Sequence, residues 1–284
     1  MKDTKNKVFL VTGATGTIGR QVVKELLNKE KNVRVLARNS HSSDFPKEVE
    51  VITGDLNKSE TLKKAFDGVY AVHFISIGDE KYTPLSNGKS IVELTKQSGI
   101  ERVTVLWNGE GNESSLEAAI RLSSLEWTIL QPQEYMANAL GWAESIIRNS
   151  EIKEPFGDRP TAAIHENDVG SVIASILING GHHKKIYTLT GPETLTPRKQ
   201  VEQLAQTLEK EITFEELNEE QTRARWKEWG LPKETMDYLY SWYGNTPEQG
   251  YKVTPIVESI LGRPAQNFKK WILDNIQNFK SDVV

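Results

Sequence analysis

The segment Val11–Leu27, VTGATGTIGRQVVKELL, constrains the fold of this chain more than any other feature. The apolar run that leads into it, Lys7–Thr12, is typical of a buried strand in a parallel sheet. From Thr17 onward, apolar residues recur at the spacing of one face of a helix. Three glycines with GxxGxxG spacing therefore fall on a strand-to-helix turn, which is the context of a dinucleotide-binding fingerprint.

Each glycine in this turn has a separate physical reason. Gly13 permits a sharp exit from the strand, Gly16 lets a pyrophosphate approach the backbone, and Gly19 lets the helix lie tight on the sheet. The start of the helix adds N–H groups and the positive end of its dipole. Glycines alone are weak evidence, and the flanking strand and helix are what favour dinucleotide binding. The predicted cofactor contacts here are Gly13, Thr15, Gly16, Thr17, Ile18 and Gly19.

The next predicted strand, Val33–Ala37, indicates which dinucleotide binds. An NAD site usually places an acid about 20 residues after the glycines, where it accepts hydrogen bonds from the ribose hydroxyls. Arg38 stands in this neighbourhood instead, and it can pair with the 2′-phosphate of NADP(H). Arg20 can assist it, or it is an ordinary solvated arginine. We therefore favour NADP(H) as the cofactor and keep NAD(H) as the alternative.

Two further strands add cofactor contacts. Asp55 and Leu56 follow a strand predicted over Val49–Thr53, so the acid can meet the adenine amino group while the leucine packs on the ring. In the alternative interpretation Asp55 caps the helix that follows. Ser76 lies near the carboxyl end of a strand predicted over Val69–Ile77, and ligands of open α/β sheets bind beyond such ends.

Strands and helices alternate up to about residue 132, which predicts an α/β fold with a doubly wound, parallel, Rossmann-like sheet. We place a dinucleotide-binding domain at 1–150 and a smaller, mainly helical lobe at 151–284, with a strand near 185–190 returning to the sheet. The lobe is rich in tryptophan and tyrosine and is expected to cover a substrate cleft. For any one of these rings, the core of the lobe is the simpler role.

Composition excludes several classes of protein. The 284 residues contain no cysteine, which rules out disulfides, thiolate catalysis and cysteine-bound metal. A net charge of -4 gives no basic field for nucleic acid. The polar start MKDTKNK has no signal core, and no apolar run approaches the ~20 residues of a membrane span. We expect a cytoplasmic protein that contacts neither nucleic acid nor membrane, either a monomer or a homodimer.

The chain resembles the NmrA-like group of atypical short-chain dehydrogenases/reductases. After the glycine turn, the similarity is carried by WTILQPQEYMAN (Trp127–Asn138), AAIHENDVGSVIASIL (Ala162–Leu177) and the long segment Tyr187–Leu217. Gln131 departs from the arginine that the family usually has. The resemblance implies a Rossmann domain and NAD(P)H. It also implies either reduction of a quinone, azo dye or similar acceptor, or a regulator that binds the nucleotide and a partner protein without turnover.

The usual catalytic pair of short-chain dehydrogenases is missing, because none of the eight tyrosines has a lysine four residues later. Hydride transfer to a quinone does not require that pair, since the cofactor carries the chemistry. Tyr135, after the sixth predicted strand, is the best candidate proton donor. His73 is better explained as a packed strand residue and Glu117 as solvated helix surface. No pattern of metal ligands is present, because the adjacent His182 and His183 point apart.

Overall fold

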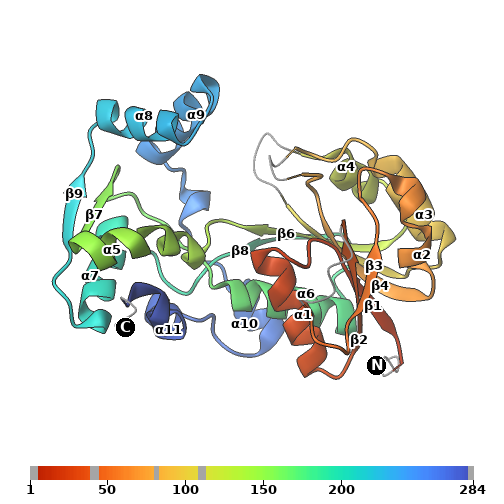
Figure 1. Ribbon diagram of the computed structural model, residues 1–284. Helices are drawn as coiled ribbons and strands as arrows, with labels where there is room; N and C mark the ends of the chain where they lie inside the picture. The colour runs from red at the N-terminus through yellow and green to blue at the C-terminus, as the bar shows by residue number, and fades with distance from the viewer. Residues whose placement is uncertain (1–5, 39–44, 80–82, 108–112, 281–284) are drawn as a thin grey trace. The chain divides into compact units, whose positions relative to one another are not determined.

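The computed structural model describes residues 6–38, 45–79, 83–107 and 113–280 (Figure 1). Its internal contacts form two units. The first contains Met1–Pro132, Glu166–Leu189 and Ile256–Arg263, and the second contains Gln133–His165, Thr190–Pro255 and Pro264–Val284. Among the described residues, no helix is both long enough and apolar enough to cross a membrane.

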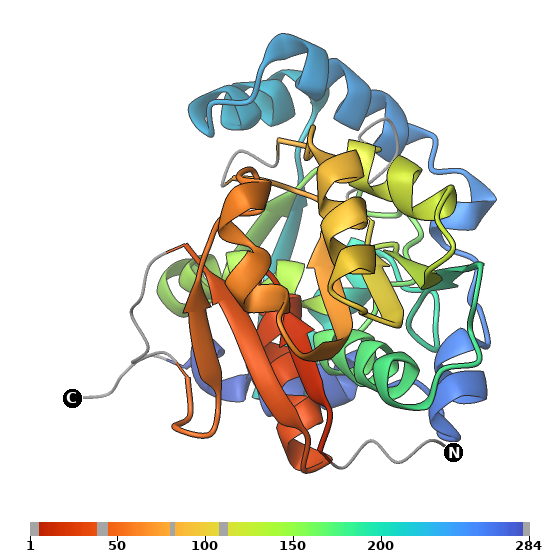
Figure 2. The ribbon, with the colours of Figure 1, turned by 90° about the vertical axis from the view of Figure 1, so that its right-hand side faces the viewer.

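A seven-stranded parallel sheet forms the centre of the first unit. Its strand order is β3-β2-β1-β4-β5-β6-β8, which confirms the predicted doubly wound fold. Figure 2 shows β3, β2 and β1 side by side in orange and red. The strands are β1 (Val8–Val11), β2 (Asn32–Ala37), β3 (Glu50–Thr53), β4 (Val69–Ile75), β5 (Arg102–Leu106), β6 (Glu126–Pro132) and β8 (Lys185–Leu189).

Helices cover both faces of this sheet (Figure 1). On one face α2 (Lys63–Phe66), α3 (Gly88–Gln97) and α4 (Ser115–Arg121) share a continuous apolar core with the sheet. On the other face lie α1 (Thr17–Asn28), α6 (Glu166–Asn179) and α10 (Ile256–Leu261).

Helices α1 and α6 pack very closely. A Cβ atom on Gly170 of α6 would lie 2.5 Å from the Cβ of Gln21 in α1, so the close contact requires glycine at this position. The packing fixes α1, and with it the turn that precedes α1.

The second unit has a small parallel sheet of β7 (Glu151–Glu154) and β9 (Thr213–Glu216). Its core includes Met136, Leu204 and Trp271. Its main helical segments are η3 (Met136–Trp142), α5 (Ala143–Asn149), α7 (Pro197–Leu208), α8 (Glu219–Glu228), α9 (Lys233–Gly244) and α11 (Phe268–Asp274).

These units differ from the division predicted at residue 150. The chain leaves the first unit after Pro132, and Glu166–Leu189 returns to it as α6 and β8. Strand β8 pairs with β6 in the region where the sequence predicted a returning strand, near 185–190. Helix α6 begins at Glu166, so Asn167 and Asp168 lie in its first turn.

His73 is a fully buried histidine in the middle of β4. Its Nδ1 lies 2.9 Å from the Thr104 hydroxyl in β5, and its Nε2 is buried with no partner among the described residues. Burial lowers the pKa of His73 to about 3, because the charged imidazolium would lose its hydration. The structure therefore agrees with a packed, neutral histidine.

This histidine makes the folded state sensitive to acid. Since the unfolded pKa is 6.5, the unfolded chain binds a proton at His73 below that pH and the folded chain does not. The stability from neutral His73 is fully present above pH 6.5 and is lost as pH falls toward about 3. As pH falls below 6.5, the free energy of unfolding should decrease through this group, with a slope that approaches about 1.4 kcal/mol per pH unit. Denaturant unfolding between pH 5 and pH 6.5 measures the slope.

Two variants separate this effect from other titrations. His73→Leu should lose most of the slope between pH 5 and pH 6.5, and the remainder should come from His182, whose pKa burial also lowers. His183→Leu, at an exposed histidine, should retain it. An unchanged slope in His73→Leu would contradict the assignment to His73.

Candidate functional site

The turn after β1 is fastened to the neighbouring strand β4. The Thr12 backbone N–H donates to the carbonyl of His73 at 2.9 Å. The Thr12 hydroxyl accepts from the backbone N–H of Ile75, also at 2.9 Å. This position lies between β1 and β4, where the strand order reverses, and open α/β sheets bind ligands beyond the carboxyl ends of the strands at such a point.

The three glycines of the turn meet different neighbours. Gly13 has φ +62°, a left-handed conformation, and a Cβ there would lie 2.6 Å from Cγ2 of Ile75. A Cβ on Gly19 would lie 2.1 Å from the Gly13 carbonyl oxygen, so Gly19 packs the helix on the turn itself. Gly16 is exposed, and a Cβ there would lie 3.3 Å from the same oxygen. The fold requires Gly13 and Gly19, whereas Gly16 leaves an open approach to the backbone.

The start of α1 offers donors to an anion. Gly16 is its N-cap, and no described side chain caps this end. The N–H groups of Thr17, Ile18 and Gly19 have no acceptor within the helix because they belong to its first turn. The Thr15 and Thr17 side chains are exposed, and Ile18 is buried. These residues fit a diphosphate, which the N–H groups and the helix dipole would both stabilise.

Two arginines lie near this turn in different roles. The Arg20 Nε donates to the Thr15 carbonyl at 2.9 Å, so this side chain braces the turn. Arg38 directly follows β2 and is exposed at the carboxyl edge of the sheet. The two arginines therefore differ: Arg20 contacts the turn itself, and Arg38 lies at the end of the neighbouring strand. Binding of a 2′-phosphate by Arg38 stays a prediction.

Asp55 and Leu56 follow β3, as predicted, but both have contacts within the protein. The Asp55 Oδ1 accepts from the backbone N–H of Asn57 at 2.9 Å and from the Asn57 side-chain amide at 3.3 Å. That amide also donates to the Gly78 carbonyl at 2.8 Å, which ties the turns after β3 and β4 together. Leu56 is buried in the core under α2 and α3. Their contact with adenine stays a prediction.

Ser76 directly follows β4 and is buried. Its hydroxyl donates to the Leu106 carbonyl at the end of β5, at 2.9 Å, and its own carbonyl accepts from the Leu85 N–H at 3.0 Å. The side chain therefore fastens two adjacent strand ends, and a direct contact with the cofactor stays a prediction.

Tyr135 belongs to the second unit and is half-buried just before η3. The backbone on both sides of it is fixed. The Glu134 carbonyl accepts from the Ile164 N–H at 2.7 Å, and the Met136 N–H donates to the Ile164 carbonyl at 3.0 Å. The ring thus projects from a rigid segment, and its role as proton donor stays a prediction.

The other titratable candidates have structural roles. Glu117 is fully buried, not solvated as the sequence suggested, because its carboxylate accepts from the Ser114 N–H at 2.7 Å in a capping box that starts α4. Burial raises the pKa of Glu117. The His182 Nδ1 lies 2.9 Å from the Tyr187 hydroxyl. Within the described ranges, no group of three or more His, Cys, Asp and Glu residues could hold a metal.

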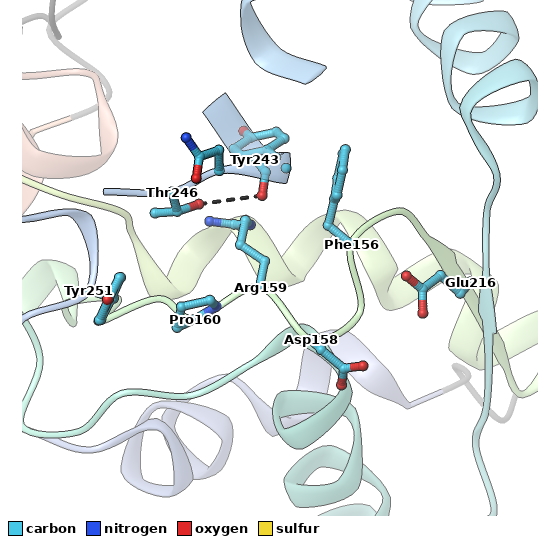
Figure 3. A pocket seen from close by; sticks show the side chains of 10 residues that line it. Phe156, Asp158, Arg159, Pro160, Glu216, Tyr243, Thr246 and Tyr251 are labelled. Atoms are coloured by element: carbon cyan, nitrogen blue, oxygen red, sulfur yellow. Dashed lines mark hydrogen bonds between the residues drawn. The ribbon is translucent and has the colours of Figure 1, made fainter. Parts of the chain in front are cut away.

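A pocket in the second unit contains residues that the sequence did not single out (Figure 3). The sequence indicated only a lobe rich in tryptophan and tyrosine, and it did not single out Phe156, Arg159 or Tyr251. The turn sequence PFGDRP at 155–160 was the available signal, since it interrupts the secondary structure with glycine and two prolines.

Comparison with known proteins agrees with this geometry. A family model described as NAD(P)H-binding matches residues 13–114, from the glycine turn to the start of α4. The chain is 30% identical over 280 residues to (4-alkanoyl-5-oxo-2,5-dihydrofuran-3-yl)methyl phosphate reductase of Streptomyces griseus, covering 96% of this chain and 99% of the relative. It is 25% identical to NAD(P)H azoreductase of Xenophilus azovorans, covering 93% and 96% of the two chains.

Solved structures share the fold. The NADPH-dependent quinone oxidoreductase QOR2 of Escherichia coli, crystallised with NADPH, superposes with a TM-score of 0.77 at 20% identity over 94% of this chain and 99% of that one. The negative transcriptional regulator NmrA, crystallised with NADP, superposes with a TM-score of 0.72 at 17% identity over 96% and 97%. The same architecture thus occurs in an enzyme and in a regulator.

Substitution of Gly16 tests the position of the phosphate. Gly16→Val should fold, since φ −78° and ψ 171° suit any residue, yet its side chain would fill the approach to the first-turn amides. We expect NADPH affinity to fall at least about tenfold, or 1.4 kcal/mol, by calorimetry.

Gly19→Ala provides the matched control. It should destabilise the fold by about 1–3 kcal/mol, because its methyl group would overlap the Gly13 carbonyl oxygen. Normal NADPH binding by a folded Gly16→Val protein would show that the diphosphate binds elsewhere.

Proposed function

Because the chain belongs to the NmrA-like group of atypical short-chain dehydrogenases/reductases, a family of NAD(P)H-binding oxidoreductases and related regulators, we propose that it is an NADPH-dependent reductase of flat, conjugated acceptors such as quinones. The observation that carries this proposal is the turn after β1. There a left-handed Gly13, an exposed Gly16 and the first-turn amides of α1 form a cradle for a diphosphate where the strand order reverses.

Arg38 supports NADPH over NADH. It stands at the end of β2, where an acid would bind the ribose hydroxyls of NAD, and the side chains of Ala37 and Arg38 have no acceptor for such hydrogen bonds. A guanidinium suits a 2′-phosphate because it offers several donors in one plane. Arg20, which braces the Thr15 carbonyl, is proposed to act on the shape of the turn and hence on both cofactors alike.

The chemistry of the acceptor follows from the missing tyrosine–lysine pair. When bound, the nicotinamide supplies a hydride. An isolated ketone would need a strong proton donor at its oxygen, whereas a quinone spreads the added charge over its conjugated system. One relative is named as an azoreductase. Another is named as the reductase of an alkanoyl dihydrofuranone, whose ring double bond is conjugated with carbonyl groups. These names support a conjugated acceptor for this chain as well.

The proposed proton donor is Tyr135, with water as the alternative source. Tyr135 is half-buried, and Ile164 forms backbone hydrogen bonds with the residues on both sides of it. The Cα atom that carries the ring is therefore held in place. His73 is unsuited to this role because burial lowers its pKa to about 3 and its Nδ1 is engaged with Thr104.

A regulator that binds the nucleotide without turnover is the second proposed function. The observation that favours it is the same absence of a tyrosine–lysine pair, since the chain retains every element of the nucleotide turn without that catalytic device. In such a protein the nucleotide would control binding to a partner protein.

Turnover separates the two functions. Oxidation of NADPH, monitored by the loss of its absorbance, should proceed with neutral quinones such as menadione. In Gly16→Val it should be much slower at the same low NADPH concentration. Tight binding of NADP without turnover on any quinone would exclude the reductase and favour the regulator.

The preference for NADPH is tested at Arg38. Arg38→Ala should weaken NADPH by about tenfold or more and leave NADH nearly unchanged, because only NADPH carries the 2′-phosphate. Arg20→Ala is the matched control and should weaken both cofactors to a similar degree, because it removes the brace on Thr15. Equal losses of NADPH and NADH affinity in Arg38→Ala would contradict the assignment.

A further inference from the structure

A cavity of about 400 Å³ lies within the second unit, a volume suited to a small organic molecule (Figure 3). Aromatic rings and charged groups from three separate segments of the chain line it. The lining residues that matter below are Phe156, Asp158, Arg159, Glu216, Tyr243 and Tyr251.

The aromatic side of this pocket is rigid. The ring of Phe156 lies 4.8 Å from that of Tyr240 and 6.2 Å from that of Tyr243, and the buried Trp226 lies 6.3 Å from Tyr243. Phe156 has φ +55°, which is unusual for a bulky residue. The next residue, Gly157, has no room for a Cβ, which would lie 2.8 Å from Cε1 of Phe214. The backbone thus holds an aromatic surface on which a flat molecule can stack.

The two arginines beside the pocket are matched by carboxylates. Arg159 forms a two-pronged ion pair with Glu134, at 3.0 and 3.3 Å, and its guanidinium lies 4.4 Å from the centre of the Tyr243 ring. Arg198 contacts Glu216 at 2.5 Å and Asp158 at 3.3 Å. An anionic ligand would have to displace one of these carboxylates to reach a guanidinium.

The carboxylates also outnumber the guanidinium at one side of the pocket. Asp158 and Glu216 share Arg198, and the Asp158 side chain is 82% exposed. Burial raises the pKa of Tyr243, with Glu134 as a further cause, so this phenol stays neutral. A ligand in the pocket therefore meets aromatic surface and an excess of negative charge.

We propose that this pocket binds the flat ring system of the acceptor and selects neutral or cationic acceptors over anionic ones. The inference rests on the proposed function, and it goes further by assigning a site and a charge preference. A preference against anions would distinguish this chain from the Streptomyces griseus relative, whose name contains a methyl phosphate and therefore an anionic group. Aromatic stacking supplies affinity for any flat acceptor, and the paired arginines exclude the anionic ones.

Two flat ions of similar size that the enzyme does not reduce provide the test. Calorimetry on the full-length protein should give naphthalen-2-yltrimethylammonium an affinity about tenfold higher than naphthalene-2-sulfonate at low ionic strength. The difference should shrink as salt is added, because both carboxylates are partly exposed. Equal affinities, tighter binding of the sulfonate, or no binding of either ion would overturn the proposal.

Charge substitutions locate the preference. The double variant Asp158→Asn, Glu216→Gln leaves Arg198 without its carboxylates and should reverse the order of the two ions. Asp158→Asn alone, at a mostly exposed side chain, should reduce the difference about threefold without affecting the fold. Phe156→Leu should weaken both ions. A preference that survives the double variant would show that the ions bind elsewhere.

Glu144→Gln is the matched control. Glu144 forms an exposed ion pair with Arg148 in the same unit, so its loss changes the net charge as much as Asp158→Asn does and should leave the difference between the ions intact. The outcome is separable from the turnover assay, since neither ion accepts hydride. Charge-ordered binding without quinone reduction would retain the pocket and reject the reductase. Reduction of quinones together with equal affinities for the two ions would support the reductase and reject the pocket.

Discussion

The close approach of α1 to the turn before it is the constraint on which the nucleotide site depends. A Cβ on Gly19 would lie 2.1 Å from the Gly13 carbonyl oxygen, so the first turn of the helix can reach its place only without a side chain there. The hydrogen bonds of Thr12 then fix this turn to β4. The proposed anion-binding groups are backbone amides held by strands on both sides. Such a site needs room close to the backbone and does not need a charged side chain.

Most polar groups that could transfer a proton in the first unit are engaged in holding the fold together. His73 bonds Thr104, Glu117 caps α4, and Ser76 joins the ends of β4 and β5. A site of this kind supplies position and a phosphate cradle more readily than acid–base catalysis. That limitation agrees with conjugated acceptors, which spread the added charge over their own atoms, and equally with a regulator that only binds the nucleotide.

The second unit uses aromatic rings and ion pairs in a different way. Arg159 stacks on Tyr243 while its donors engage Glu134, and Arg198 lies 4.6 Å from the Phe214 ring while it contacts Glu216. Each guanidinium thus binds a ring and a carboxylate at once, which orders the residues around the pocket and neutralises both cations. The proposed ring-binding surface therefore lies beside guanidinium groups that are already paired with carboxylates.

The sequence by itself determined the parallel sheet and the nucleotide turn, because their signals are local: strand, glycines and helix follow one another between Lys7 and Asn28. It also indicated the return of β8. Only the tertiary structure decided that Glu117 is buried and that Arg20 braces Thr15. It alone also revealed the pocket, whose residues come from segments as distant as Phe156 and Tyr251. Burial and ion pairing depend on contacts between such distant segments, and the spacing of residues along the chain does not encode those contacts.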